Sequence, residues 1–287
     1  MNSSKAAAGS HITLAIYSLW RRELIRFFRQ RNRIVGALGT PIIFWIFLGA
    51  GLGDSFRAPE SYGARSPLQF MAPGVVAMIA LFTAIFSTIS IIEDRKEGFL
   101  QGVLVSPCPR FAMVMGKILG GATLAFIQAG FFMALTPLIG IQVGSLMDWI
   151  MVAVSIFGLS LGMTALGFIL AWRMESTQGF HAITNLFLMP MWLLSGSIFP
   201  VESAAGWLRW IMNINPLTYG VQALRMILDH QRTGVAYLYE TSFWMAAGVF
   251  TSFTVILVCV GLVIAGDSVE ANIGAPAEPS EPSDSKK

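Results

Sequence analysis

Residues 71–92 of the chain read MAPGVVAMIALFTAIFSTISII, and this run of 22 residues contains no Asp, Glu, Lys or Arg. A helix needs about 20 mostly apolar residues to cross the hydrocarbon core of a bilayer, which is roughly 30 Å thick. The run is therefore long enough to span a membrane. Because no water in that core can satisfy backbone polar groups, we expect the run to be an α-helix.

Five further uncharged runs of similar length lie on either side of it, at residues 34–53, 118–140, 149–171, 181–199 and 243–265. Of the 287 residues, 55% are hydrophobic and 12% are charged, whereas a soluble domain carries about 25% charged residues. We predict an all-α integral membrane protein whose membrane domain, residues 34–265, has six transmembrane helices.

The distribution of Lys and Arg predicts the orientation, because cytoplasmic loops retain these residues. Twelve of them fall before the first run and in the second and fourth loops, against five in the other three loops. We therefore expect both termini on the cytoplasmic side of the cell's inner membrane. The net charge of +3 arises from these topology signals, so no nucleic-acid partner is predicted.

Residues 1–33 form a cytoplasmic segment in which two sets of residues recur at helical spacing. One set is apolar and the other basic: Ile16, Trp20, Leu24, Phe27 and Phe28, against Arg22, Arg26, Arg29 and Arg33. This pattern predicts an amphipathic helix in the membrane interface, facing anionic lipid headgroups. The alternative is that the arginines serve only to fix the topology.

Residues 200–232 are moderately apolar, but Pro200 and Pro216 divide them. Each piece of about 13 residues would be about 20 Å long as a helix, too short to span the bilayer. We expect two short re-entrant helices packed against the outer mouth of the bundle. Residues 266–287 are rich in Pro, Ser and Glu, which is typical of a disordered tail, here cytoplasmic.

The sequence predicts no catalytic, cofactor or metal site. Gly116 and Lys117 lack the earlier glycine of a phosphate-binding loop and are followed by Ile118, so ATP is not bound in that way. The three histidines lie in different segments without the spacing of metal ligands. None of the six runs carries a charged residue for an ion relay. A solute moved uphill would therefore draw its energy from a cytoplasmic contact.

Residues 93–117, the second loop, are the place for such a contact. Dense charge of both signs is followed by apolar residues at helical spacing, namely Leu100, Val103 and Leu104. This predicts a short amphipathic helix that docks into a groove on a partner and is ended by Pro107 and Pro109. The alternative is an ordinary solvated loop.

Two stretches resemble the ABC-2 type permeases, particularly their daunorubicin-resistance branch. The first reads EDRKEGFLQGVLVSP over residues 93–107 and is followed by Arg110 and Gly116–Lys117. The second reads NPLTYGVQALR over residues 215–225 and is preceded by Ser195–Gly196 and Phe199–Pro200. The resemblance implies six spans, a cytoplasmic coupling helix after the second span and paired re-entrant helices before the sixth.

The resemblance also implies site residues and partners. The contact with an ATPase would involve Glu93, Asp94, Arg95, Glu97, Gly98, Leu100 and Gln101. The re-entrant motif would comprise Asn215, Pro216, Leu217, Thr218, Tyr219 and Arg225. Two permeases, as a homodimer, would work with two copies of an ATP-binding subunit that holds the ATP and magnesium. Lys96 and Gln101 depart from the family pattern, in which acidic residues are frequent at those positions.

The resulting hypothesis is the permease subunit of an exporter that moves an amphipathic drug or lipid across the membrane. Export of a lipid-linked polysaccharide or glycolipid is the alternative within the same machinery. A membrane-embedded enzyme or a passive channel is the alternative from a different class. Conductance or turnover by the purified chain without any ATPase would favour that last class.

Overall fold

The computed structural model describes residues 2–52, 66–105, 109–141, 143–233 and 242–273. Over these residues the chain is helical and contains no strand. The first half consists of α1 (Asn2–Arg29), α2 (Arg31–Leu52), α3 (Pro67–Ser87), α4 (Ile89–Lys96), α5 (Phe99–Val105), α6 (Arg110–Leu135) and the 3-10 turn η3 (Thr136–Ile139). The second half consists of α7 (Leu146–Arg173), α8 (Thr177–Trp192), the π-helical turn η4 (Leu193–Ser197), the 3-10 turn η5 (Val201–Ser203), α9 (Gly206–Ile214), α10 (Pro216–Thr233) and α11 (Phe243–Ile273).

Four helical segments among the described residues are long and apolar enough to cross a membrane: Pro67–Lys96, Arg110–Ile139, Leu146–Arg173 and Phe243–Gly266. They correspond to the second, third, fourth and sixth predicted spans. The first predicted span contains a shorter apolar helix, Leu38–Gly51. The fifth predicted span lies in α8, whose 16 residues are followed by the π-helical turn η4. Six crossings therefore remain a prediction, while the helical membrane architecture is established.

The helix α3 forms the centre of the bundle. In its most apolar stretch 89% of the residues are buried inside the chain, against 17% for α11. Close packing around α3 depends on small residues, since a β-carbon added to Gly167 of α7 would lie 3.0 Å from Cα of Ile85. Because only 17% of its apolar stretch is buried, α11 turns most of its apolar surface outward, where lipid would cover it.

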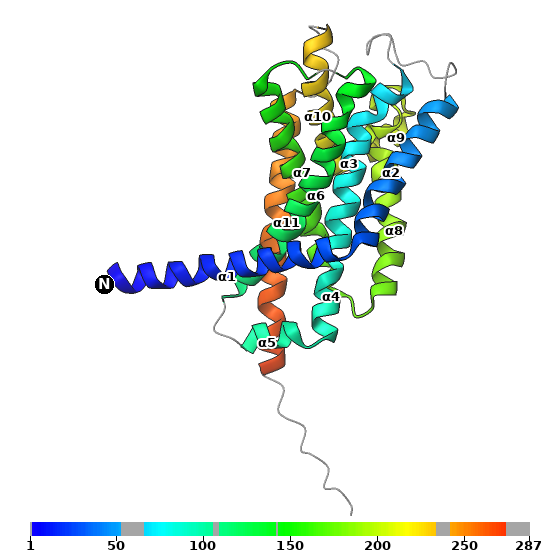
Figure 1. Cartoon of the computed structure of the whole chain (residues 1–287). Coiled ribbons are helices and arrows are strands. Elements are labelled where there is room, and N and C mark those ends of the chain that lie inside the picture. Colours follow the sequence, from blue (N-terminus) through cyan, green and yellow to red (C-terminus); the bar gives the residue numbers. More distant parts are fainter. Residues whose placement is uncertain (1, 53–65, 106–108, 142, 234–241, 274–287) are drawn as a thin grey trace, which may run out of the picture.

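The helix α1 crosses the lower part of the bundle in Figure 1, nearly at right angles to the long helices, and α4, α5 and the end of α11 extend below it. We call this part of the molecule the α1 end. It packs against α6, where a β-carbon added to Gly116 would lie 2.7 Å from Cβ of Leu19. The predicted division of its faces is wrong in part. Arg22 and Arg26 point into the bundle and form ion pairs there, whereas Phe28 is exposed.

Three predicted boundaries also need correction. The loop predicted at residues 93–117 is largely helical, because α4 runs to Lys96, α5 covers Phe99–Val105 and α6 starts at Arg110. Residues 266–273 of the predicted tail belong to α11, and residues 274–287 lie outside the described part. The re-entrant region divides before Pro216 as predicted, but α10 has 18 residues, about 27 Å of helix, and is longer than expected.

Candidate functional site

The predicted coupling segment is a helix, a tight turn and a second helix. The turn lies at Glu97 and Gly98, and Gly98 has a φ of 76°. A glycine adopts this left-handed conformation without the steric cost that a β-carbon brings. The side chain of Glu97 is 62% exposed, and Lys96 is exposed beside it. The turn therefore presents one acidic and one basic side chain to the surroundings at the α1 end.

Asp94, one turn earlier, is fully buried and binds three cations. The two nitrogens of the Arg22 fork donate to its two oxygens at 2.8 and 2.7 Å, and Arg26 donates to Oδ1 at 2.7 Å. Lys117 Nζ donates to Oδ2. The same lysine donates to Glu23 Oε1 at 2.6 Å. We call these five residues the Asp94 cluster.

The Asp94 cluster joins helices that are far apart in the sequence, since Arg22, Glu23 and Arg26 lie in α1, Asp94 in α4 and Lys117 in α6. The hydrogen bond to Asp94 is the main cause that raises the pKa of the Arg22 guanidinium above its ordinary value. Burial of the charges is tolerable because each has a partner of opposite sign. The cluster thus ties α1 to the coupling segment.

The neighbours of Asp94 are also held inside the chain. Arg26 donates to Glu93 at 2.9 Å, so this carboxylate too is bound to α1. Arg95 donates to the carbonyl of Trp172 and, at 3.1 Å, to that of Met174, at the C-terminal end of α7. A cation there satisfies carbonyls that the helix leaves open and complements its dipole.

The structure therefore separates the seven predicted coupling residues. Asp94 and Leu100 are buried, and Glu93 and Arg95 are bound within the chain. Glu97 and Gly98 form the turn, and the side chain of Gln101 lies outside the described part. The role of the segment in coupling stays a prediction, but a partner would meet the turn and not Asp94.

The residues of the re-entrant motif brace the end of α8. Asn215 Nδ2 donates to the carbonyl of Met191 at 2.6 Å, and its Oδ1 accepts from Leu217 N at 3.1 Å. Thr218 donates to the carbonyl of Met212 at 2.6 Å and lies 3.3 Å from that of Leu194. Each side chain therefore satisfies backbone groups where helices end.

Arg225 completes this brace. Its Nη2 donates to the carbonyl of Gly196 at 2.9 Å, and its guanidinium carbon lies 4.1 Å from the centre of the Phe70 ring. Gly196 belongs to the π-helical turn η4 and has a φ of 78°. Such turns leave carbonyls outside the regular helical pattern, and Arg225 binds one of them.

The last motif residues have local roles. Pro216 begins α10, Leu217 is buried, and Tyr219 donates to the carbonyl of Asn213 at 2.8 Å. The motif is thus a structural brace in the described part of the chain, and none of its residues lines the cavity described next.

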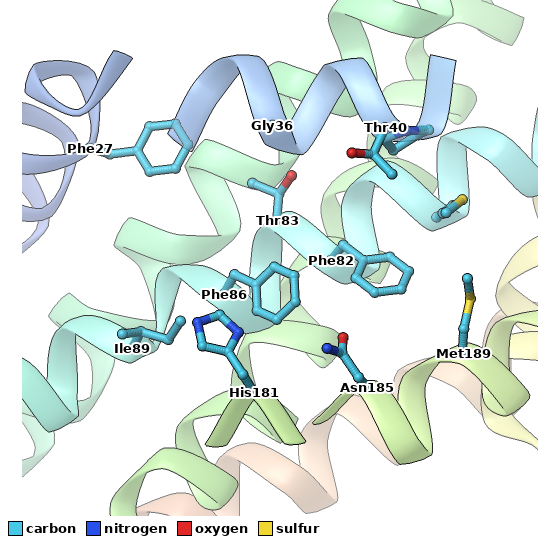
Figure 2. Close-up of a pocket in the computed structure, with 12 residues that line it drawn as sticks. Phe27, Gly36, Thr40, Phe82, Thr83, Phe86, Ile89, His181, Asn185 and Met189 are labelled. Atoms are coloured by element: carbon cyan, nitrogen blue, oxygen red, sulfur yellow. The ribbon is translucent and has the colours of Figure 1, made fainter. Parts of the chain in front are cut away.

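A cavity of about 700 Å³ lies between the junction of α1 and α2, the helix α3 and the helix α8 (Figure 2). The helix α2 contributes Gly36, Thr40 and Pro41, and α8 contributes His181, Asn185 and Met189. The other lining residues are Phe27, Met78, Phe82, Thr83, Phe86 and Ile89. No Asp, Glu, Lys or Arg is among them.

The polar groups of the cavity are few. Thr83 donates to Oε1 of the buried Gln128 at 2.7 Å, so its hydroxyl is held in place and offers an acceptor to the cavity. His181 and Asn185 lie one helical turn apart on α8, and the ring of His181 is 5.1 Å from that of Phe86. Pockets of this size, mostly apolar with a few placed polar groups, are typical of sites for small molecules.

Sequence reasoning missed most of the Asp94 cluster. Glu23 is the single acidic residue among the first 33. This could have indicated a buried ion pair, because a lone carboxylate on a basic helix needs a cationic partner once it is buried. Lys117 enters the sequence analysis as a second-loop cation, as a neighbour of Gly116 and as part of the family pattern, and none of these predicts that it pairs with Glu23 and Asp94. In the described part of the chain, no group of His, Cys, Asp and Glu is arranged to hold a metal ion.

Comparisons with known proteins find similar sequences over most of the chain. A family model described as ABC-2 type transporter matches residues 15–228. A protein of Cyanophora paradoxa described as a transport permease, ycf38, is 27% identical over 231 residues, which cover 80% of this chain and 79% of that protein. Nodulation protein J of Rhizobium meliloti is 25% identical over 217 residues, covering 74% and 80%. YbhR of Escherichia coli, described as a multidrug ABC transporter permease, is 30% identical over 165 residues, covering 55% and 43%.

Proposed function

The chain belongs to the ABC-2 type transporter family, and from that membership we propose that it is the permease subunit of an exporter whose ATP is hydrolysed by a separate chain. The observation that carries the proposal is an uncharged cavity that α4 joins to a charged, exposed turn: Ile89 at the start of this helix lines the cavity, and Glu97 follows its last residue. A cavity without ionisable side chains other than His181 offers little to bind a coupling ion. The energy would therefore enter through the turn at Glu97 and Gly98.

The proposed substrate is an amphipathic small molecule such as a drug or lipid. The rings of Phe27, Phe82 and Phe86 offer apolar surface, while Thr83 and Asn185 offer hydrogen bonds. The volume of about 700 Å³ suits a drug-sized ligand. The description of YbhR as a multidrug permease supports this choice. A lipid-linked polysaccharide, the alternative, would need a wider passage.

The proposed assembly has two permeases, as a homodimer, and two ATP-binding subunits on the cytoplasmic side. The α1 end would then face the cytoplasm, as the positive charge of the N-terminal segment predicts. Large apolar side chains on the outer surfaces of α2 and α8, such as Phe47 and Phe187, are exposed in the single chain. They support a contact between the two copies beside the cavity.

In the proposed cycle, closure of the ATP-binding subunits displaces the turn at Glu97 and Gly98. The two permeases would then rock between inward-facing and outward-facing states around the cavity. Asp94 and Arg95 would not touch the ATPase but would hold the turn to α1 and α7.

The test is affinity purification of the tagged chain from its native membrane in mild detergent, followed by mass spectrometry and an ATPase assay. We expect an ATP-binding subunit to co-purify with wild type and to be depleted by Glu97→Lys. The matched control is Glu175→Lys, which changes a carboxylate outside the coupling segment and should keep the partner. An oligomer without any ATPase would contradict the proposal and favour a channel or an enzyme.

Substrate binding needs a separate measurement. The purified complex in proteoliposomes should take up daunorubicin, a fluorescent amphipathic probe, only when ATP is supplied outside. Asn185→Leu should lower the uptake without lowering co-purification of the ATPase, because Asn185 lines the cavity and belongs to α8, outside the coupling segment. Equal uptake by this variant would remove the cavity from the proposed path.

A further inference from the structure

The cavity and the Asp94 cluster meet at the end of α1. Phe27 is buried and lines the cavity, and the preceding residue, Arg26, is bound to Asp94. In Figure 2 the Phe27 ring lies at the edge of the cavity next to α1, on the side away from Met189. The ionic network and the wall of the cavity are therefore one residue apart in the chain.

The backbone at this point is a joint between two helices. α1 ends at Arg29 and α2 begins at Arg31, and the N–H of Gln30 donates to the carbonyl of Phe27 at 2.9 Å. Three residues of α2 line the same cavity. A displacement of α1 would thus move the Phe27 ring and the start of α2.

The Asp94 cluster connects this joint to the coupling segment. Asp94 lies three residues before Glu97, and its three cations come from α1 and α6. Separating a buried ion pair leaves an uncompensated charge, which is strongly unfavourable. A movement of α4 that keeps these ion pairs, and so moves α1 with it, therefore costs less free energy than one that separates them.

We propose that Phe27 is a gate at the α1 end of the cavity and that the Asp94 cluster positions it. An ATPase that displaces the turn at Glu97 moves α4, the cluster carries α1, and the Phe27 ring shifts relative to Phe86. Phe27 touches the path, whereas Arg22, Arg26, Asp94 and Lys117 act through it as positioning residues. This inference rests on the proposed function, since an ATPase must move the turn.

The test measures access to the cavity and needs no substrate. Asn185→Cys serves as the reporter in a chain that carries Cys108→Ser and Cys259→Ser, assembled with its ATPase in vesicles. A membrane-impermeant maleimide is added on the α1 side, with or without ATP and vanadate. We expect nucleotide to slow labelling roughly tenfold in the reporter chain, within the usual range of coupling between sites.

Three variants of the reporter chain test the gate. Phe27→Ala should abolish the effect of nucleotide, with fast labelling in both states, and the bulky Phe27→Met should restore it. Phe28→Ala is the matched control, because Phe28 is exposed and does not line the cavity, and it should behave as the reporter chain does.

The positioning role has its own variants. Arg26→Gln removes one of three cations from Asp94 and also the partner of Glu93 and Glu97, and it should reduce the effect of nucleotide while the complex still assembles. Asp94→Glu should keep more of the effect than Asp94→Asn. An unchanged response in Arg26→Gln would remove the cluster from the proposal and leave only a passive constriction.

The outcomes separate the two proposals. If nucleotide slows labelling equally in Phe27→Ala and in the reporter chain, the gate is wrong and the exporter proposal stands. If nucleotide has no effect even in the reporter chain, the gate and the ATP-driven cycle both fail.

Discussion

The two ends of the helical bundle are held together by different interactions. At the α1 end, charged side chains from three helices bind one another around the buried Asp94. At the opposite end, where α9 lies (Figure 1) and η4 follows α8, Asn215, Thr218 and Arg225 bind backbone carbonyls. At the α1 end the bonds join side chains of different helices. At the opposite end they satisfy backbone carbonyls where α8 ends in the π-helical turn η4.

This difference suggests different tasks. Bonds to the carbonyls of α8 and η4 fix a particular backbone conformation, because that conformation leaves those carbonyls open. Ion pairs between helices instead hold whole helices together and leave the backbone of each regular. The α1 end is therefore the one expected to move as a unit, and the opposite end the one expected to keep its shape.

The largest effect is expected from Asp94→Asn. The variant removes a buried anion and leaves Arg22 and Lys117 with Glu23, while Arg26 keeps its pairs with Glu93 and Glu97. Breaking a buried ion pair in this way costs about 3–5 kcal/mol. Unfolding of the purified protein in mixed micelles, followed by circular dichroism, measures the loss. Glu97→Gln is the control: it removes a 62% exposed carboxylate that lies 3.5 Å from Arg26, and it should differ little from wild type because exposed ion pairs contribute little. Equal stability of the two variants would show that the cluster does not hold the α1 end.

A smaller effect is expected from Arg225→Gln at the opposite end. The variant loses the hydrogen bond to Gly196 and the contact with the Phe70 ring. A hydrogen bond from a charged donor contributes about 2 kcal/mol, and the same unfolding experiment should show a loss of that order. Arg173→Gln changes an exposed arginine and should be nearly neutral. A loss as large as that of Asp94→Asn would contradict the contrast between the two ends.

The smallest effect is expected from Asn215→Ala. The variant removes neutral hydrogen bonds to Met191 and Leu217, and a bond of this kind contributes about 1 kcal/mol. The exposed Asn213 is the matched control as Asn213→Ala. ATPase activity of the assembled complex should survive Asn215→Ala, because the brace lies away from the coupling turn. Loss of activity without loss of stability would instead give the opposite end a direct part in coupling.

Hydropathy located four of the six predicted spans in helices long enough to cross a membrane, but it did not find where those helices end. The predicted span 71–92 lies inside the observed Pro67–Lys96, and the predicted span 118–140 starts eight residues after Arg110. Both predicted spans stop at charged residues, Glu93 and Asp94 after the first and Lys117 before the second. Asp94 and Lys117 lie within their helices because they form an ion pair with each other. A search for uncharged runs cannot find such a pair, because it stops at every charged residue.

For the candidate site, too, the sequence indicated which segments matter but not which residues contact one another. The sequence pointed to the charged segment at Glu93 and to the motif at Asn215, and both proved to be places where the chain binds itself. The partner of Lys117, Glu23, is 94 residues away in the sequence, and only the packing of α1 on α6 brings them together. The cavity could not be found from the sequence, because its lining residues come from five helices and each contributes side chains typical of any apolar surface.

The most direct test of the account is photo-crosslinking from the turn that is proposed to meet the ATPase. Benzoylphenylalanine replaces Glu97 in one variant and Leu138, an exposed residue of η3, in the control, and membranes are irradiated before purification. The account predicts a covalent adduct with an ATP-binding subunit from position 97 and none from position 138. An adduct from position 138 alone, or no ATP-binding subunit attached at either position, would contradict it.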